Sequence, residues 1–339
     1  MKKKLLIVSG SAGAGHTTAA IALKETIDKI YGDSIEVTHV DILDHTTKLM
    51  KKVYRDLYIY LAKKRPLIYG IVYKYTDREG YKSGILDWSN TKRFRRYLRK
   101  NKFDFIVTTH FLAANVISRM KKKKKVNAPL MNIVTDFGAH VIWLTKAEYT
   151  IVPDSQNVEY FKYKDVSGDN VFDYGIPIKP VFAEQKSRDE LRKKFNLDNN
   201  KTTVLILSGG FGVGPIELVL KSLEKVTEPV EVIVICGKNE KLFEDCNSLK
   251  KELSYNLIPV GYTTEMDEYM KASDMVITKP GGVTTAEALA SGTPIVILSP
   301  IIGQEDKNAD MLLEEGCAIK ITYIPIAFYK INALLKNKD

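Results

Sequence analysis

The sequence has few cysteines and no long hydrophobic run. Its three cysteines, Cys236, Cys246 and Cys317, form no CxxC pair or other metal-ligand spacing, and their odd number argues against a disulfide framework. No stretch reaches the roughly 18 apolar residues of a membrane-spanning helix. The basic start MKKKLLIVSG has too short an apolar run for a secretory signal. These absences predict a cytoplasmic protein whose contact with a membrane is at most peripheral.

The amino-terminal glycine loop lacks the residue that would complete either of two nucleotide-binding motifs. Leu5 to Val8 predicts a buried strand, followed by GSAGAGHTT and an amphipathic helix. Compared with a P-loop, the segment has His16 where a lysine must reach the phosphates. Compared with the dinucleotide fingerprint, it has Thr18 at the third glycine. An NTPase is therefore a minor alternative, which ATP hydrolysis would reveal, and a dehydrogenase is equally disfavoured.

Basic residues outnumber acidic ones, with 51 Lys and Arg against 41 Asp and Glu and a net charge of +10. This excess predicts an anionic partner, either nucleic acid or an acidic membrane surface. The run Lys121 to Lys125 is typical of a solvated loop, although each lysine could contribute about 1 kcal/mol against an anionic leaflet. Because no recognised RNA-binding motif accompanies the charge, we favour the membrane and expect no nucleic-acid partner.

The stretch from His45 to Asp77 interleaves tyrosines and lysines with leucine and isoleucine. Amphipathic aromatic and basic side chains are typical of a membrane interface, and Tyr58 and Tyr69 are candidates for that contact. The alternative is an ordinary surface helix whose apolar stripe faces the core. Helical spacing places four residues on that stripe: Leu49, Val53, Leu57 and Leu61.

The segment from Asp274 to Asp310 predicts a strand, glycine turn, helix, strand and polar loop. Met275 to Thr278 is a short apolar strand, and Gly281-Gly282 would let the backbone approach a ligand closely. The helix expected over Thr284 to Ala290 directs unpaired N–H groups and a positive dipole end toward the space beside these glycines. This arrangement predicts a site for a phosphate or diphosphate.

Polar residues extend this site along the helix and beyond the next strand, Pro294 to Leu298. Glu287 could accept two hydrogen bonds from a ribose diol, or it could form a capping box with Thr284. Gly303-Gln304-Glu305 and Asn308 follow the strand and carry the amide and carboxylate groups that recognise sugar hydroxyls. A solvated loop would also be polar.

Candidate acid–base groups lie near strand ends in the amino-terminal half. His16 stands at the start of a helix, whose positive end favours a neutral imidazole that could act as a base. A loop histidine with a structural hydrogen bond is the alternative. Strands over Phe105 to Thr109 and Leu130 to Thr135 end at His110 and Asp136, where parallel sheets line ligand crevices. Asp136 could assist the base or cap the next helix.

The segment KPGGVTTAEALASGTPIVILSPIIGQEDKNA closely resembles the nucleotide-sugar site of glycosyltransferase family 28. GSAGAGHTTAA resembles the family's amino-terminal glycine loop, whose histidine is implicated in catalysis, and VTDFGAHVIW resembles a segment near its acceptor cleft. The resemblance spans nearly the whole chain and is strongest to the diacylglycerol glucosyltransferase and monogalactosyldiacylglycerol synthase branch. It implies an α/β fold of the GT-B type, with two facing Rossmann-like domains and parallel sheets.

The resemblance also implies roles for individual residues. His16 and Asp136 would be catalytic, Glu287 would contact the ribose, and Gln304 with Glu305 would contact the donor sugar. The full set of expected UDP-sugar contacts is Gly209, Gly210, Phe211, Gly212, Val260, Gly261, Tyr262, Met266, Pro280, Gly281, Gly282, Val283, Thr284, Glu287, Gln304, Glu305 and Asn308. The expected acceptor and membrane contacts are Gly15, Tyr58, Tyr69, His140 and Trp143.

A boundary is expected at Tyr174 to Phe182, where two prolines and a glycine precede a charged helix beginning near Ser187. We predict an acceptor- and membrane-binding domain over 1–175 and a linker over 176–186. A UDP-sugar domain over 187–322 and a terminal helix over 323–339 would follow. The last part is more compact than the family's usual tail.

The resemblance implies an inverting hexosyltransferase that adds glucose from UDP-glucose to diacylglycerol at the cytoplasmic face of a membrane. UDP-sugar would be a substrate, and no cofactor is expected. The sequence has no Asp-x-Asp triplet, so no metal is expected either. The alternatives are a UDP-galactose-dependent synthase, a non-catalytic nucleotide-sugar or lipid-binding regulator, and the lipid II N-acetylglucosaminyltransferase. That last branch has paired glutamines where this chain has Gln304-Glu305.

Overall fold

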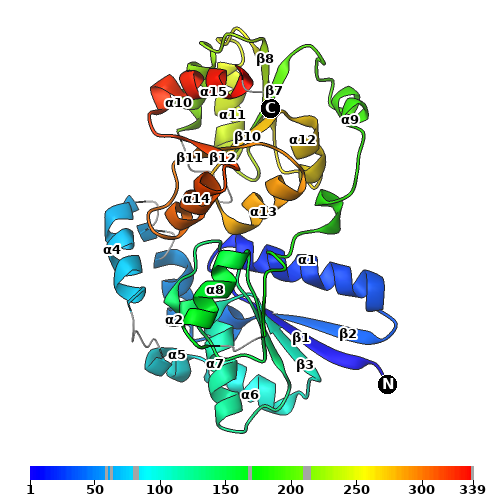
Figure 1. Ribbon diagram of the computed structural model, residues 1–339, viewed down its shortest axis with the longest axis vertical. Helices are drawn as coiled ribbons and strands as arrows, with labels where there is room; N and C mark the ends of the chain where they lie inside the picture. The colour runs from blue at the N-terminus through cyan, green and yellow to red at the C-terminus, as the bar shows by residue number, and fades with distance from the viewer. Residues whose placement is uncertain (58–59, 62–63, 79–83, 167–169, 209–214, 337–339) are drawn as a thin grey trace. The chain divides into compact units, whose positions relative to one another are not determined.

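The structure is a computed structural model that describes residues 1–339 apart from 58–59, 62–63, 79–83, 167–169, 209–214 and 337–339. Two six-stranded parallel sheets, one in each half of the chain, organise the described residues (Figure 1). By compactness the chain forms two units. The first consists of Met1–Pro180, Gly281–Ala286 and Ile302–Asn308, and the second of Val181–Pro280, Glu287–Ile301 and Ala309–Asp339.

The first sheet has the order β2-β1-β3-β4-β5-β6, and all neighbouring strands are parallel. Alternate residues of the first strand enter cores on opposite faces: Leu6 and Val8 pack in one cluster, Leu5 and Ile7 in the other. Helices are needed on both faces, as expected for a parallel sheet. The strands are β1 (Lys3–Ser9), β2 (Ile35–Asp41), β3 (Phe105–Thr108), β4 (Leu130–Ile133), β5 (Tyr149–Ile151) and β6 (Val171–Phe172).

The helices of the first half supply the side chains that cover this sheet. In α7, for example, Leu112 and Ile117 are completely buried in the cluster that contains Leu6. The α-helices are α1 (Ala14–Tyr31), α2 (Lys48–Lys52), α4 (Pro66–Thr76), α5 (Gly84–Asn90), α6 (Lys92–Lys100), α7 (Phe111–Lys122) and α8 (Ser155–Tyr163). The shorter helical segments are η1 (Ile42–His45), the π-helical turn η2 (Val53–Leu57), η3 (Val141–Trp143) and η4 (Pro180–Phe182).

The second sheet has the order β12-β11-β10-β7-β8-β9 and is also parallel throughout. Its core includes the completely buried side chains of Val204, Val232 and Ile277. The strands are β7 (Thr202–Leu207), β8 (Val230–Ile235), β9 (Asn256–Val260), β10 (Met275–Thr278), β11 (Ile295–Leu298) and β12 (Ala318–Ile321). The helices are α9 (Arg188–Lys194), α10 (Ile216–Leu223), α11 (Glu240–Leu249), α12 (Met266–Ala272), α13 (Gly282–Ala290), α14 (Gln304–Glu314), η5 (Ile324–Ile326) and α15 (Ala327–Lys336).

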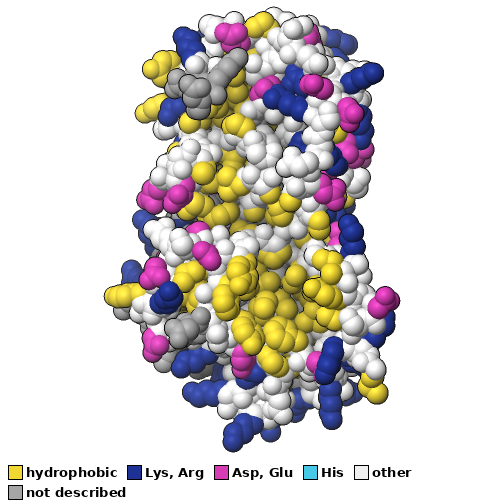
Figure 2. Space-filling model, turned by 45° about the vertical axis from the view of Figure 1, so that its right-hand side comes forward, with side chains coloured by type: hydrophobic (Ala, Val, Ile, Leu, Met, Phe, Trp, Pro, Cys, Tyr) yellow, Lys and Arg dark blue, Asp and Glu magenta, His cyan; other side chains and the backbone are white. Residues whose placement is uncertain are grey.

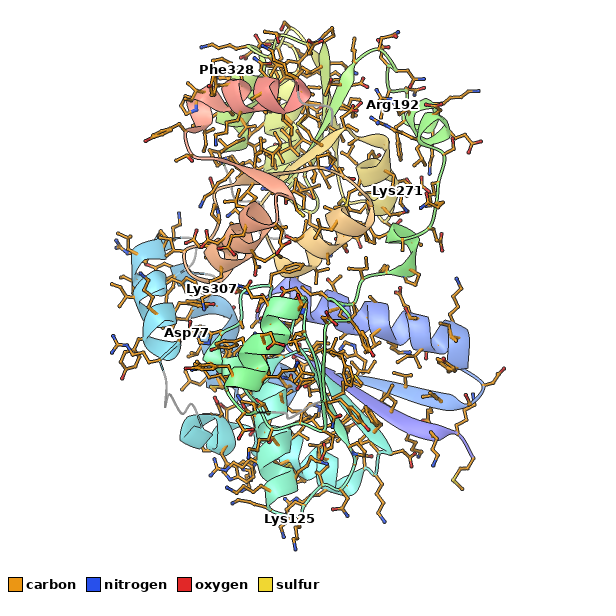
Figure 3. The ribbon with its side chains drawn as sticks, viewed as in Figure 1. Asp77, Lys125, Arg192, Lys271, Lys307 and Phe328 are labelled. Atoms are coloured by element: carbon orange, nitrogen blue, oxygen red, sulfur yellow. The ribbon has the colours of Figure 1, made fainter. Side chains whose placement is uncertain are left out.

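A buried ion network fixes the base of the second sheet. Arg192 of α9 is nearly inaccessible, and its guanidinium lies 3.7 Å from Glu231 and 3.4 Å from Asp274 (Figure 3). The same guanidinium donates to the carbonyl oxygens of Ala272, Asp198 and Lys201. Because the charges are paired and hydrogen-bonded, this burial is compatible with a stable unit.

The predicted α/β class with two parallel sheets is confirmed, but two local alternatives are wrong. Helix α13 begins at Gly282, so Thr284 lies inside the helix and cannot be the cap of a capping box. Asp136 does not cap the next helical segment either. That role belongs to His140, whose Nδ1 accepts from the N–H of Ile142 at 3.1 Å.

The apolar stripe expected to face either the core or a membrane is exposed. Leu49, Val53 and Leu57 are 73, 41 and 46% accessible, so the core-facing alternative is wrong for these residues. The regular helix ends at Lys52, and the chain continues as the π-helical turn η2. Helix α4 also exposes apolar side chains, namely Leu67, Ile68, Ile71, Val72 and Tyr75.

Apolar surface is also present where the first sheet is incompletely covered. Phe105, Met131 and Phe172 are only partly buried in the cluster on the α1 face. Figure 2 shows a broad apolar area in its lower half. Within the described ranges, no helix is both long and apolar enough to cross a bilayer.

Candidate functional site

The carboxyl ends of β1 and β3 meet where the strand order of the first sheet reverses. Connections from neighbouring strands diverge at such a point and leave a crevice for ligands. Gly10, in the loop after β1, approaches the loop after β3 so closely that a Cβ would lie 2.6 Å from the imidazole of His110. Glycine is required here by close packing. The loop is held by Asp41, which accepts from the N–H of Ser11 at 3.3 Å.

His16 lies in the first turn of α1 and is held at both its backbone and its ring. Its carbonyl oxygen accepts from the hydroxyl of Thr109 at 2.8 Å. Its Nδ1 lies 2.7 Å from the hydroxyl oxygen of Thr135, which follows β4. The ring of His16 meets that of His110 edge to face at 4.7 Å and that of Trp143 at 5.8 Å. With Nδ1 engaged, Nε2 is the ring nitrogen left for proton transfer.

Burial and nearby charge shift the pKa of the His16 imidazole in opposite directions. Burial lowers the pKa of its imidazole below the ordinary value, while the negative charge of Asp136 and an interaction with the backbone of Thr109 raise it. The net pKa remains lowered, so the ring is neutral at physiological pH. When it takes up a proton, the nearby carboxylate stabilises the imidazolium. A neutral ring whose protonated form is stabilised by a nearby carboxylate has the properties that a general base needs.

Asp136 is buried, and its carboxylate accepts hydrogen bonds from two side chains. Its Oδ2 accepts from the indole Nε1–H of Trp143 at 3.2 Å, and its Oδ1 accepts from the side-chain amide of Gln304. Gln304 starts α14 and belongs to the first unit. The structure therefore brings together two residues that sequence motifs indicated separately, a carboxylate beside His16 and an amide of the predicted donor-sugar loop.

The first turn of α13 also belongs to this unit. The N–H groups of Gly282, Val283 and Thr284 have no carbonyl partner within the helix, because they precede its first complete turn. Gly282 lies against the backbone after β4, so a Cβ there would be 2.1 Å from the carbonyl oxygen of Thr135. A Cβ at Gly15 would lie 3.7 Å from Val283, an ordinary packing distance. These contacts place a helix N-terminus, with its preference for anions, near the His16 turn.

Several buried polar atoms in this part of the first unit have no hydrogen-bond partner among the described residues. They are the hydroxyl of Thr17, Nε2 of His110 and the hydroxyl of Thr285. Nδ1 of His110 accepts from the N–H of Leu112, so the orphaned Nε2 carries the proton of the neutral ring. Burial, followed by the charge of His16, holds the pKa of His110 well below its ordinary value.

A second group of contacts joins α4 to the loop before α14 and to its first turn. Asp77, which caps α4, forms an ion pair with Lys307 at 2.6 Å (Figure 3). Ring atoms of Tyr73 lie 2.7 Å from the Cβ position of Gly303, whose φ is +98°. Asn308 accepts from the N–H of Gly138 at 3.0 Å. These contacts hold the Gly303–Asn308 segment within the first unit.

The expected acceptor residues occupy different environments. His140 is buried, and its ring packs edge to face on Tyr73 at 4.6 Å. Burial lowers the pKa of His140, and Asp77 opposes that shift. Trp143 and Tyr69 are also buried, whereas Gly15 lies in the first turn of α1. Tyr58 lies outside the described residues.

The remaining expected donor contacts lie at strand ends of the second sheet or just beyond them. Val260 ends β9, Gly261 and Tyr262 follow it, and Met266 starts α12. Tyr262 is exposed, and the ammonium of Lys238 lies 5.4 Å from its ring centroid. Pro280 and Gly281 precede α13, which begins at Gly282, and Glu287 and Glu305 lie within α13 and α14. Four expected residues lie outside the described ones: Gly209, Gly210, Phe211 and Gly212.

Thr135 and Thr17 were not indicated as site groups by the sequence. Thr135 contacts His16 across 119 positions of sequence, so no local pattern could identify the pair. A signal for His110 was present, because it follows a strand at the carboxyl edge of the sheet. Within the described part of the chain, no group of three or more His, Cys, Asp or Glu residues is arranged to hold a metal ion.

Solved structures share the fold of this chain. MurG of Acinetobacter baumannii aligns with a TM-score of 0.62 at 15% identity, over 99% of this chain and 91% of that chain. Anabaena HepE in complex with UDP and glucose aligns with a TM-score of 0.55 at 15% identity, over 99% and 90%. The fold is therefore GT-B, the two-Rossmann-domain class of glycosyltransferases.

Sequence comparisons define the family more narrowly. Residues 16–178 match the family described as Monogalactosyldiacylglycerol (MGDG) synthase, and residues 203–338 match the Glycosyltransferase family 28 C-terminal domain. The processive diacylglycerol beta-glucosyltransferase of Bacillus cereus (strain G9842) is 31% identical, over 98% of this chain and 86% of that protein. The enzyme of the same name from Bacillus subtilis (strain 168) is 29% identical, over 99% and 88%. The chain belongs to glycosyltransferase family 28, in the branch of these glycolipid-forming enzymes.

Proposed function

We propose that this glycosyltransferase transfers glucose from UDP-glucose to diacylglycerol, with inversion at the anomeric carbon. The observation that carries the proposal is the neutral His16 beside Asp136, in the same compact unit as Gln304 and the first turn of α13. The relatives named for diacylglycerol glucosylation support the choice of acceptor and sugar. HepE with bound UDP and glucose supports a UDP-sugar donor.

In the proposed reaction, Nε2 of His16 removes the proton of the acceptor hydroxyl as its oxygen attacks the anomeric carbon. The new carbon–oxygen bond forms on the face opposite UDP, and the bond to the β-phosphate oxygen breaks with its electron pair going to UDP. Asp136 stabilises the imidazolium through its charge. Attack from the opposite face gives a β-linked product from an α-linked donor.

We propose the following donor contacts. The unpaired N–H groups at the start of α13 would receive the diphosphate, and the charge that develops on departing UDP would be stabilised there. Glu287 would accept from the ribose hydroxyls, and Gln304 with Glu305 would recognise the sugar. Backbone atoms near Val260 and Tyr262 would recognise uracil. We propose that this arrangement requires no metal, which transfer in the presence of a chelator tests.

We further propose peripheral attachment to an anionic membrane at its cytoplasmic face. The support is the group of exposed apolar residues on α4 and η2, within a chain whose net charge is +10. Lysine and apolar side chains together favour an interfacial location. Galactose is the second candidate for the donor sugar, because residues 16–178 match the MGDG synthase family.

The test is a panel of donors and acceptors with purified protein. Diacylglycerol in anionic vesicles is incubated with UDP-glucose, UDP-galactose or UDP-N-acetylglucosamine in chelator, and UDP release and lipid products are measured. We expect glucosyldiacylglycerol as the main product. Binding of UDP without turnover with any donor would contradict the enzyme assignment and favour a binding protein. Transfer only from UDP-galactose would replace glucose by the second candidate.

A further inference from the structure

The end of α4 and the start of α14 approach each other closely within the first unit. A Cβ at Gly70, inside α4, would lie 2.5 Å from a methyl carbon of Ile302, and one at Gly303 would lie 2.7 Å from the ring of Tyr73. Each segment thus has a glycine where the other segment makes contact. Because glycine weakens the interior of a helix, this packing explains Gly70 better than helix formation does.

One ion pair joins the same two segments across 230 positions of sequence. Nζ of Lys307 lies 2.6 Å from Oδ2 of Asp77 and donates to the carbonyl oxygen of Ala139 at 2.9 Å (Figure 3). Oδ1 of Asp77 accepts from the N–H of Val141 at 2.9 Å. Asp77 therefore contacts both the first turn of α14 and the first residue of η3.

The contact with α14 leads to one oxygen of the Asp136 carboxylate. Oδ1 of Asp136 accepts from the side-chain amide of Gln304, which starts α14. Lys307 lies three residues later, and residues three apart in a helix are neighbours on its surface. A single helical turn therefore joins the ammonium that contacts Asp77 to the amide that contacts Asp136.

The contact with η3 leads to the other oxygen of the same carboxylate. Val141 starts η3, and Trp143 ends it. The indole of Trp143 donates to Oδ2 of Asp136 at 3.2 Å, while the N–H of Val141 donates to Asp77. The amide and the indole that hold Asp136 thus come from two segments that are both bound by Asp77.

The charge of Asp77 is balanced by Lys307. His140 also lies near it, with Nδ1 3.6 Å from Oδ1, but this nitrogen accepts from the N–H of Ile142 and so carries no proton. Among the described residues, no Lys or Arg other than Lys307 forms an ion pair with Asp77. The side chain of Asp77 is 20% exposed, so loss of the ammonium would leave a largely buried carboxylate without a cation.

We propose that Asp77 and Lys307 are positioning residues for the transfer reaction. Neither is among the expected substrate contacts. They act by holding the two segments whose side chains orient Asp136 beside His16. The inference rests on the proposed function, in which this carboxylate stabilises the imidazolium formed when the acceptor loses its proton. It also gives α4 a part in catalysis, because the residue that caps this helix fixes the acid–base groups.

The first test compares variants in the transfer assay at saturating UDP-glucose and diacylglycerol. Lys307→Met and Asp77→Asn each remove one charge of the pair and should lower kcat by about tenfold, the effect of losing one hydrogen bond to a charged group. Lys307→Arg keeps a cation and should recover most of the rate. Lys221→Met is the matched control, because it removes the same charge from a 2.6 Å ion pair with Glu217 on α10. Equal kcat in Lys307→Met and Lys221→Met would overturn the proposal.

A double-mutant cycle tests whether Lys307 acts through Gln304. In Gln304→Ala the amide donor is already absent, so the addition of Lys307→Met should lower kcat by no more than about twofold. Independent roles would instead multiply the losses of the two single variants. Multiplied losses would overturn the connection through α14.

Stability and UDP affinity distinguish positioning from a purely structural contact. Positioning predicts that Lys307→Met lowers kcat and leaves UDP affinity unchanged, whereas a parallel loss of kcat, UDP affinity and melting temperature would overturn the proposal. Gly70→Ala is the second probe if Lys307→Met does not fold. Its Cβ would displace Ile302, although alanine favours the helix, so kcat should fall without weakening α4. An unchanged kcat in Gly70→Ala would also count against the proposal.

Fluorescence separates this inference from the proposed function, because it requires no turnover. In a Trp88→Phe background the buried Trp143 is the remaining tryptophan. Asp77→Ala removes the acceptor of the η3 backbone and should shift the emission of Trp143, whereas Asp77→Asn keeps a side-chain oxygen there and should not. Identical emission in the two variants would overturn the connection through η3. Absence of transfer by the unaltered protein would refute the proposed function, and the emission shift would still decide whether Asp77 positions the partners of Asp136.

Discussion

The contact between Thr135 and His16 leads to the sharpest prediction about the catalytic base. Their 2.7 Å separation joins a hydroxyl to Nδ1. If Nε2 takes the acceptor proton, Nδ1 must carry a hydrogen before and after the step, so the hydroxyl oxygen must accept from it. Thr135 would thus be a positioning residue that fixes the tautomer of His16. Thr135→Val removes the acceptor with little change in shape.

The size of the effect follows from leaving a buried N–H without a partner. Such a group costs about 1–3 kcal/mol, which corresponds to roughly 5- to 150-fold in rate if the cost falls on the protonated state. The loss should appear in kcat, because Thr135 contacts His16 rather than substrate. The pKa of His16, already lowered by burial, should fall further, since the imidazolium loses an acceptor. The acid limb of the pH–rate profile should then move to lower pH.

The assay is UDP release with saturating diacylglycerol and UDP-glucose across a range of pH. Thr135→Ser is the matched control, because it keeps the hydroxyl, and it should recover most of the rate. UDP affinity should be unchanged in both variants. Turnover by Thr135→Val within about twofold of the unaltered protein would refute the reasoning, since the smallest expected loss is about fivefold. Equal loss in the serine variant would indicate packing rather than the hydrogen bond.

Two further predictions concern close packing and pH. Gly282→Ala should weaken UDP binding and lower stability by about 1–3 kcal/mol, since its Cβ would lie 2.1 Å from the carbonyl oxygen of Thr135. Gly281→Ala meets no atom within 4 Å and is the control; equal melting temperatures and UDP affinities would contradict the packing argument. Because burial lowers the pKa of His110, its neutral form contributes stability that is present above the unfolded pKa near 6.5 and is lost as pH falls toward the folded value. Chemical denaturation should show a loss of up to about 1.4 kcal/mol per pH unit below that point, smaller in His110→Asn, which keeps a capping group; an unchanged slope would contradict the assignment.

Sequence patterns predicted the parts of the fold that depend on neighbouring residues. The strand Met275–Thr278 and the glycine turn after it were predictable, because apolar periodicity and paired glycines are local signals. The start of α13 was placed two residues late, since Gly282 is a poor helix former and its position is set by packing on Thr135. The exposed Leu49 stripe could not be assigned to core or surface from spacing alone, because both environments select the same pattern.

The candidate site also contains residues that local patterns indicate and contacts that those patterns do not indicate. Strand ends and motifs indicated His16 and Asp136 as candidates, but the contact of His16 with Thr135 and that of Asp136 with Gln304 connect distant segments. The contacts of Arg95 and Arg119 with the ring of Trp88 likewise join three different helices, and none of these helices has a distinctive motif. Such groups require the tertiary structure, since side chains far apart in sequence share no periodicity.

The most direct test of the central claim is the anomeric configuration of the lipid product made by unaltered protein and by His16→Ala. Both proteins are incubated with diacylglycerol vesicles and UDP-glucose in chelator, and the product is examined by proton NMR. We predict a β-linked glucosyldiacylglycerol from the unaltered protein. Formation by His16→Ala should be slower by about 100-fold or more, the usual contribution of a general base. An α-linked product, or equal rates from the two proteins, would contradict inversion with His16 as the base.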